Sequence, residues 1–201
     1  MFEKELVRMG TPKIFGKFDL FDMSDERYSN AYRSNKGTSS DSKFHPESLF
    51  KMIRTRSDKL GTINIPQWYI KTQGRLTSPR LRNLDGLLDI SVINLMLIPA
   101  VDLSNIQQGL LPSGNHSNSK LGPSVRGYLT LDALKLTGVK SALGTFEMRP
   151  MWKETARSGK IRELFEGSFS FTLVYGDVLK RLGYRDLDQP KITFWAIRAE
   201  A

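Results

Sequence analysis

The segment from Ser168 to Tyr175 constrains the fold more than any other part of this sequence. The large apolar side chains of Phe169, Phe171 and Leu173 alternate there with Ser170, Thr172 and Val174. This period of two is typical of a β-strand with one buried face. Apolar runs predict further strands at 125–131, 143–151 and 192–197, with a helix at 153–166 between them. Strands with interspersed helices and no internal repeat predict an α+β fold, a mostly antiparallel β-sheet packed with a few helices.

The middle of the chain adds two more expected helices. Pro46 opens an amphipathic stretch, 47–60, and Gly61 supplies a stop signal. Residues 62–76 predict one or two strands, after which Ser78-Pro79 resembles the start of a helix that runs to about Asp89. The apolar run 92–98 fits a buried strand or a continuing helix equally well.

The sequence divides into an expected flexible N-terminal arm, residues 1–45, and a single globular domain, residues 46–201. Residues 24–43 are mostly polar and carry too little apolar surface to offset the entropy of ordering them. One apolar cluster interrupts the arm, and we expect it to dock on the body or on a partner chain. It comprises Ile14, Phe15, Phe18, Leu20 and Phe21.

The sequence lacks the residues that several kinds of metal site and catalytic site require. The chain has no cysteine and only two histidines, His45 and His116, which excludes thiolate and multi-histidine metal sites. No nucleophile elbow or phosphate loop is present, and the N-terminal segment does not resemble a secretory signal. Asp85 and Asp89 would share one helix face, an arrangement that favours a solvated surface balancing nearby arginines over acid-base catalysis. We therefore expect no enzyme activity, no metal and no cofactor in a soluble or membrane-peripheral protein.

The distribution of charge along the sequence says more about function than these motifs do. The 201 residues carry a net charge of +9, and residues 43–82 hold nine cations against Glu47 and Asp58, which places +7 in this one stretch. Such a surface fits the phosphates of nucleic acid or of anionic lipid. The predicted basic patch consists of Lys43, Lys51, Arg54, Arg56, Lys59, Lys71, Arg75, Arg80 and Arg82.

Short sequence strings also follow one another in a distinctive order. A predicted strand with Trp68 and Tyr69 leads into a basic Ser-Pro turn and a predicted amphipathic helix. An apolar segment, a long loop at 112–124 and a strand opening Arg126-Gly-Tyr-Leu follow. Near the end, the run from Phe165 to Asp177 is a strand of small and hydroxyl residues that ends in an acidic turn. Over residues 62–180, this order resembles the globular domain of rhabdovirus matrix proteins, with plant-infecting members as the nearer analogy.

The resemblance implies a non-enzymatic viral assembly protein. Such a protein self-associates, condenses the helical ribonucleoprotein and attaches it to the inner face of the viral envelope. The implied partners are further copies of the chain in a non-closing lattice, the nucleoprotein-RNA complex and anionic membrane lipids, with the envelope glycoprotein tail left open. The implied location is the virion beneath the envelope, and the host cytoplasm and inner membrane face, with the nucleus left open. No Pro-Pro-x-Tyr motif is present, so recruitment of host sorting machinery by that motif is not expected.

In that family the arm and an exposed loop join neighbouring subunits, which would build a non-closing oligomer. Carried onto this chain, the loop residues expected to self-associate with the Ile14–Phe21 cluster are Leu111, Pro112, Asn115, His116, Leu121 and Pro123. A non-specific nucleic-acid-binding accessory protein, such as a silencing suppressor or movement-type protein, is the main alternative because the same cations would serve it. A small enzyme using Asp85 and Asp89 is a further one.

Overall fold

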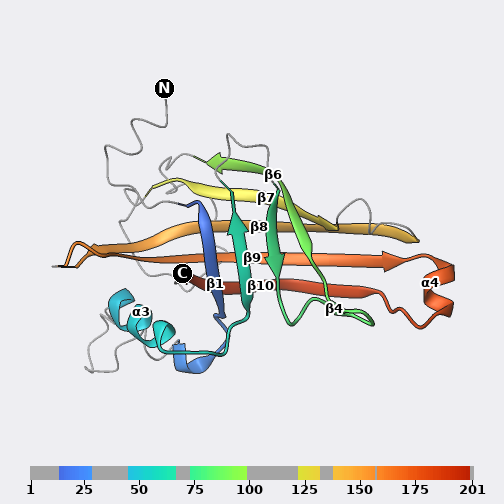
Figure 1. Cartoon of the computed structure of the whole chain (residues 1–201), viewed down its shortest axis with the longest axis horizontal. Helices are drawn as coiled ribbons and strands as arrows, with labels where there is room; N and C mark the ends of the chain where they lie inside the picture. Colours follow the sequence, from blue (N-terminus) through green and yellow to red (C-terminus); the bar gives the residue numbers. More distant parts are fainter. Residues whose placement is uncertain are drawn as a thin grey trace, which may run out of the picture.

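A computed structural model describes residues 14–28, 45–66, 73–98, 122–131, 138–156 and 158–199. The described residues include helices α3 and α4, a helical turn at 26–28 and ten strands (Figure 1). In chain order the helices and strands are β1 (Gly16–Asp22), α3 (Pro46–Arg54), β2 (Gly61–Ile65), β3 (Gly74–Thr77), β4 (Arg82–Asn83), β5 (Gly86–Leu87), β6 (Ile90–Ile98), β7 (Ser124–Leu131), β8 (Val139–Thr155), β9 (Ile161–Tyr175), α4 (Asp177–Arg181) and β10 (Leu187–Arg198).

Eight of the strands form a closed barrel in the order β1-β10-β9-β8-β7-β6-β3-β2, and β2 returns to β1. Each pairing around the barrel is antiparallel. The expected α+β fold, a sheet packed with helices, is therefore wrong. The strands bury their apolar faces against one another across a closed interior, so the barrel does not need helices to cover it.

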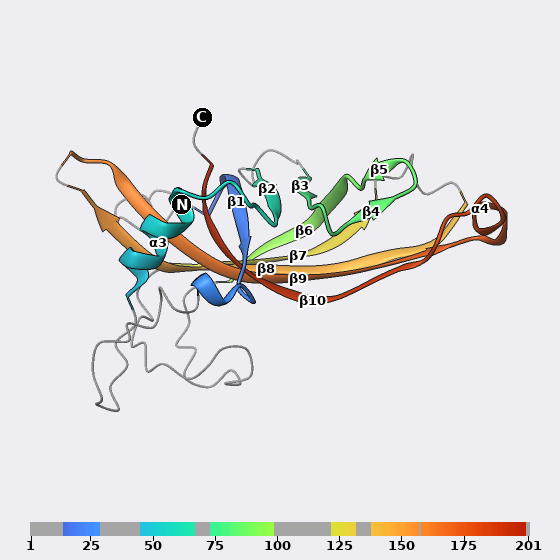
Figure 2. The same cartoon turned by 90° about the horizontal axis from the view of Figure 1, so that it is seen from below.

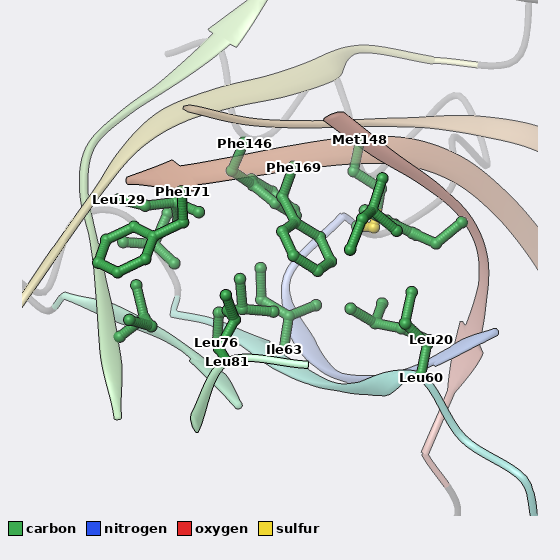
Figure 3. Close-up of a cluster of buried hydrophobic side chains, with 14 of the residues drawn as sticks. Leu20, Leu60, Ile63, Leu76, Leu81, Leu129, Phe146, Met148, Phe169 and Phe171 are labelled. Atoms are coloured by element: carbon green, nitrogen blue, oxygen red, sulfur yellow. The ribbon is translucent and has the colours of Figure 1, made fainter. Parts of the chain in front are cut away.

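The barrel interior is packed with side chains. Phe146, Phe169 and Phe171 of β8 and β9 face Ile63 and Leu76 of β2 and β3 across it (Figure 3). Gly167 on β9 makes this packing possible, because a Cβ there would lie only 2.5 Å from the Phe194 ring. The alternation that starts at Phe169 is thus the signature of an inward-facing strand.

The expected helix from Ser78 to Asp89 is wrong. Ser78 is buried at the end of β3, where its Oγ donates to the carbonyl of Leu60 at 2.7 Å. The chain then forms the β4–β5 hairpin, with Gly86 in the left-handed region at φ 118° and Asp85 N donating to Asn83 Oδ1 at 2.9 Å. These turn contacts fix a reversal that a helix cannot accommodate.

The expected helix at 153–166 is also wrong. This stretch is the end of β8, a turn and the first part of β9, paired in register from Trp152 with Leu164 to Thr155 with Ile161. The turn is closed by the amide of Ala156, which donates to the carbonyl of Lys160 at 2.9 Å. The apolar run left open at 92–98 is a strand, β6.

The helix that Pro46 opens is confirmed as α3, although it ends at Arg54 and not near Leu60. Its apolar face, formed by Leu49, Phe50 and Ile53, packs on the outside of the barrel. The outer layer beneath it includes Leu164 of β9 and Trp195 of β10. This second cluster of buried side chains is separate from the barrel interior.

The long strands β8 and β9 extend beyond the rest of the barrel at both ends, and β10 extends beyond it at the end near α4 (Figure 2). At about 3.3 Å per residue, the 15 residues of β9 follow a path of about 50 Å. Helix α3 lies beside the end where the β8–β9 turn sits, and α4 with the β4–β5 hairpin lies at the other end (Figures 1 and 2). The molecule therefore presents two separate ends.

Candidate functional site

An open groove of about 440 Å³ lies between the exposed side of α3 and the first residues of β9. Three cations line it, Lys51 and Arg54 from the helix and Arg162 from the strand, together with Phe50 and Thr55. Helical spacing brings Lys51 and Arg54 to one side of α3. Leu49, Phe50 and Ile53 are buried, so the side of α3 with Lys51 and Arg54 remains exposed and borders the groove that Arg162 also lines. We call this site the α3 groove.

The strand register explains how Arg162 reaches the groove. Trp152 pairs with Leu164, and Glu154 pairs with Arg162. Alternate residues of a strand share a face, so all four lie on the face that carries Leu164 beneath the helix. The Trp152 ring lies 5.5 Å from the Phe50 ring between centroids. An aromatic pair therefore adjoins the three cations.

Two carboxylates partly neutralise the positive charge of the groove. Glu47 pairs with Lys51 at 2.6 Å, and Glu154 pairs with Arg162 at 3.3 Å. The hydrogen bond from Lys51 lowers the pKa of Glu47, and the nearby charge of Arg162 lowers it further. The Glu47–Lys51 pair is exposed, so an incoming polyanion can compete with that carboxylate at small cost, whereas the Glu154–Arg162 pair is part-buried.

The structure distributes the predicted basic patch around the barrel. Lys43 and Lys71 lie outside the described residues. Lys51 and Arg54 line the α3 groove, Arg56 and Lys59 follow α3, and Arg75, Arg80 and Arg82 lie on or after β3. Only two of the seven described cations therefore share one site.

Carboxylates that are distant in sequence neutralise much of this patch. Lys59 pairs with Asp19 at 2.8 Å, Arg75 pairs with Asp89 at 2.7 Å, and Arg80 pairs with Asp22. Within the stretch itself, Arg56 pairs with Asp58 and its hydrogen bond lowers the pKa of Asp58 to about 2. A count of charges along 43–82 overlooks the three aspartates that folding brings in.

The apolar cluster of the expected N-terminal arm packs within this chain. Ile14, Phe18, Leu20 and Phe21 are buried in this chain, and Phe15 packs against the interior. Phe18 and Leu20 belong to β1, a barrel strand within the segment expected to be a flexible arm. The cluster thus docks on the body, the first of the two expected arrangements.

The loop residues Leu111, Pro112, Asn115, His116 and Leu121 lie outside the described residues. Pro123 is half-buried just before β7. The self-association role of the loop therefore stays a prediction, as does that of the arm.

The paired carboxylates of the enzyme alternative engage different partners. Asp85 accepts a hydrogen bond from the Tyr184 hydroxyl at 2.8 Å, and Asp89 pairs with Arg75. The helix that would have aligned them is absent. Within the described ranges, no group of three or more His, Cys, Asp or Glu side chains is placed to hold a metal ion.

Arg162 is the groove residue that sequence reasoning missed. The sequence predicts a helix at 153–166, and nothing in that prediction places Arg162 near α3. The basic composition of the β8–β9 hairpin, which also carries Lys153 and Lys160, was the one available hint.

Among the described helices, none has the length and apolar character needed to cross a membrane. Compared with protein-family models, with curated proteins and with solved structures, the chain finds no match. The resemblance to rhabdovirus matrix proteins therefore rests on residues alone, and the amphipathic helix that formed part of it is a β-hairpin.

Proposed function

We propose that this protein is a non-enzymatic assembly protein of the matrix type, which binds ribonucleoprotein phosphates in the α3 groove. The observation that carries the proposal is the convergence of Lys51, Arg54 and Arg162 from two elements on one open groove. Lysine and arginine are the side chains that hold nucleic-acid phosphates, and arginine does so with two parallel hydrogen bonds.

The packed interior supports a role for the surface. Phe18 lies edge-on to Phe165 at 5.0 Å, and Phe146 stacks on Phe194 at 6.0 Å, within the space that a ligand-binding barrel would leave open. The groove offers cations to backbone phosphates, contacts that carry no sequence information, so we expect binding to be insensitive to sequence. In the matrix role, the protein joins the ribonucleoprotein to the envelope and to further copies of itself.

The second candidate is a non-specific nucleic-acid-binding accessory protein. The Phe50 and Trp152 rings beside the groove favour it, because single-stranded nucleic acid stacks its bases on such rings. The two candidates differ in what they assemble. A matrix protein sediments as growing oligomers with nucleoprotein-RNA, whereas the accessory protein binds naked RNA and remains monomeric.

Fluorescence anisotropy with labelled single-stranded RNA tests the groove. We expect the double substitution Arg54→Gln with Arg162→Gln to weaken binding about 100-fold, because each charge-assisted hydrogen bond contributes at least about tenfold. The control is Arg75→Gln with Arg126→Gln, which removes the same charge from β3 and β7. Equal losses in both double variants would show that net charge, and not the groove, binds RNA.

A further inference from the structure

The end of the barrel opposite α3 carries an unusual concentration of exposed apolar side chains. Eight large apolar residues are exposed in the described part of the chain, and four of them lie here. Leu84 is 65% and Leu87 52% exposed on the β4–β5 hairpin, and Val178 is 71% and Leu182 66% exposed on or just after α4. We call residues 82–87 and 177–185 the distal tip.

The distal tip is one connected unit. Tyr184 donates to Asp85 at 2.8 Å, and its ring lies 5.2 Å from that of Tyr175. Asn83 in turn donates to the Tyr175 hydroxyl at 3.3 Å. A Cβ on Gly183 would lie 3.5 Å from Cδ1 of Leu84, so the hairpin and the turn after α4 are in close contact. These contacts between the hairpin and the segment after α4 fix the positions of the backbone that carries the exposed leucines.

Cations surround these apolar side chains. Arg82, Arg181 and Arg185 are exposed, and none of them forms an ion pair with another described residue. The neighbouring lysines differ, because Lys180 pairs with Asp186 at 2.6 Å and Lys140 pairs with Asp177 at 3.2 Å. Exposed arginines that have no ion pair with a described residue lie on the same segments as the exposed leucines, so the tip carries both apolar and positive side chains.

We propose that the distal tip docks this protein on an anionic lipid bilayer. Leu84, Val178 and Leu182 enter the interfacial region while the arginines contact lipid phosphates. A specific protein partner fits less well, since stable interfaces bury roughly 800 Å² on each side and four side chains cover much less. A bilayer needs no matching shape, and anionic headgroups complement the three arginines.

This assignment deepens the proposed function, on which it rests for the presence of a membrane partner. It moves the lipid contact away from the basic stretch 43–82, leaving Arg82 as the one predicted patch residue in it. The α3 groove and the distal tip lie at opposite ends of β9 (Figure 2). A ribonucleoprotein and a membrane can therefore be held at the same time, without competing for one set of cations.

Vesicle flotation tests the assignment with the full chain. The vesicles are phosphatidylcholine with or without phosphatidylserine, an anionic lipid of cytoplasmic leaflets. The wild type is expected to float with the anionic vesicles. The double substitution Leu84→Ser with Leu182→Ser should lower the partition coefficient by about tenfold or more, as expected for removing leucines from an apolar phase.

The matched control is Ile161→Ser, which removes a side chain that is 52% exposed at the opposite end of β9. It should float as the wild type does. Unchanged flotation of the leucine variant would overturn the assignment, as would failure of the wild type to bind anionic vesicles. Neither result touches the proposed RNA binding, which is measured on the same proteins by anisotropy.

A site-specific probe gives a second measurement, because the chain has no cysteine of its own. Leu84→Cys and Ile161→Cys each accept one environment-sensitive fluorophore. On anionic vesicles, the label at position 84 should shift to the blue and be quenched by spin-labelled lipid, while the label at position 161 stays unchanged. Equal responses at both positions would overturn the assignment of the tip.

Discussion

The two ends of the long strands differ in how the chain covers them. At one end, α3 packs Leu49 and Ile53 on the barrel wall and leaves cations facing outward. At the other end, α4 buries none of its residues, and Leu84 and Leu182 remain exposed. The same strands run through both ends, so the difference comes from the connections. Connections are the parts of a barrel that its packed interior constrains least.

Exposed charge and exposed apolar surface therefore suit different kinds of partner at the two ends. The α3 groove is cationic above a buried apolar layer, which suits phosphates in water. The distal tip has its apolar side chains outermost, which suits an interface with lipid. Substitutions in the body should affect both ends, and substitutions at either end should affect only that end.

The largest effect should come from the body that both ends share. Phe169→Ala removes a ring that is 1% exposed in the interior, and we expect it to lower the free energy of unfolding by about 3–5 kcal/mol. Chemical denaturation measures this loss, and RNA and vesicle binding should both fall with it. Leu143→Ala is the control, because this exposed leucine on β8 should cost less than about 0.5 kcal/mol. Equal costs would contradict the packed interior.

Disrupting the packing of α3 on the barrel should have the next largest effect, and it should affect binding only at the α3 groove. Ile53 is fully buried in the outer cluster, so Ile53→Ala should cost about 2–5 kcal/mol and loosen the helix from the wall. RNA affinity should fall because the groove loses one side. Vesicle binding, measured below the unfolding transition, should stay unchanged. A parallel loss of both activities would mean that the two ends are not independent.

The aromatic pair should contribute less. Trp152→Leu keeps an apolar side chain against Phe50 but removes the larger ring, and we expect single-stranded RNA to bind about tenfold more weakly, as for one lost stacking contact. Binding of duplex RNA, whose bases are not free to stack, is the internal control. If both RNAs lose affinity equally, the ring supports the groove and does not stack on bases.

The smallest expected effect is an increase in RNA affinity. Glu47→Gln removes the carboxylate that pairs with Lys51, and RNA should bind about two- to threefold more tightly, as expected for an exposed ion pair. Because the pKa of Glu47 is lowered, the wild type should keep this restraint until the pH falls below the usual value of 4.5. Its affinity should then rise toward that of the variant. A pH titration of RNA anisotropy with both proteins checks this sign.

Local patterns were sufficient for the strands of the last third. The predicted strands at 125–131, 143–151, 168–175 and 192–197 all lie within β7 to β10, because a buried face imposes a period of two. Barrel closure has no such signal. It depends on β1 pairing with β10, Phe18 opposite Arg198, which are contacts between the two extremes of the chain.

Local patterns also misled where leucines recur by chance at helical spacing. Leu81 and Leu88 are buried and Leu84 and Leu87 are exposed, so the four residues do not form one apolar face. The same limit applies to charge. Asp19, Asp22 and Asp89 neutralise part of the predicted patch because strand pairing brings them near it, while Arg162 joins the α3 groove from a hairpin.

Co-flotation of labelled RNA with anionic vesicles measures in one experiment whether the two ends bind RNA and lipid separately. Wild-type protein should carry the RNA to the top of the gradient. The Arg54→Gln, Arg162→Gln protein should float without RNA, and the Leu84→Ser, Leu182→Ser protein should stay at the bottom with RNA bound. If the first variant carries as much RNA to the vesicles as the wild type, the α3 groove is not the site of ribonucleoprotein binding.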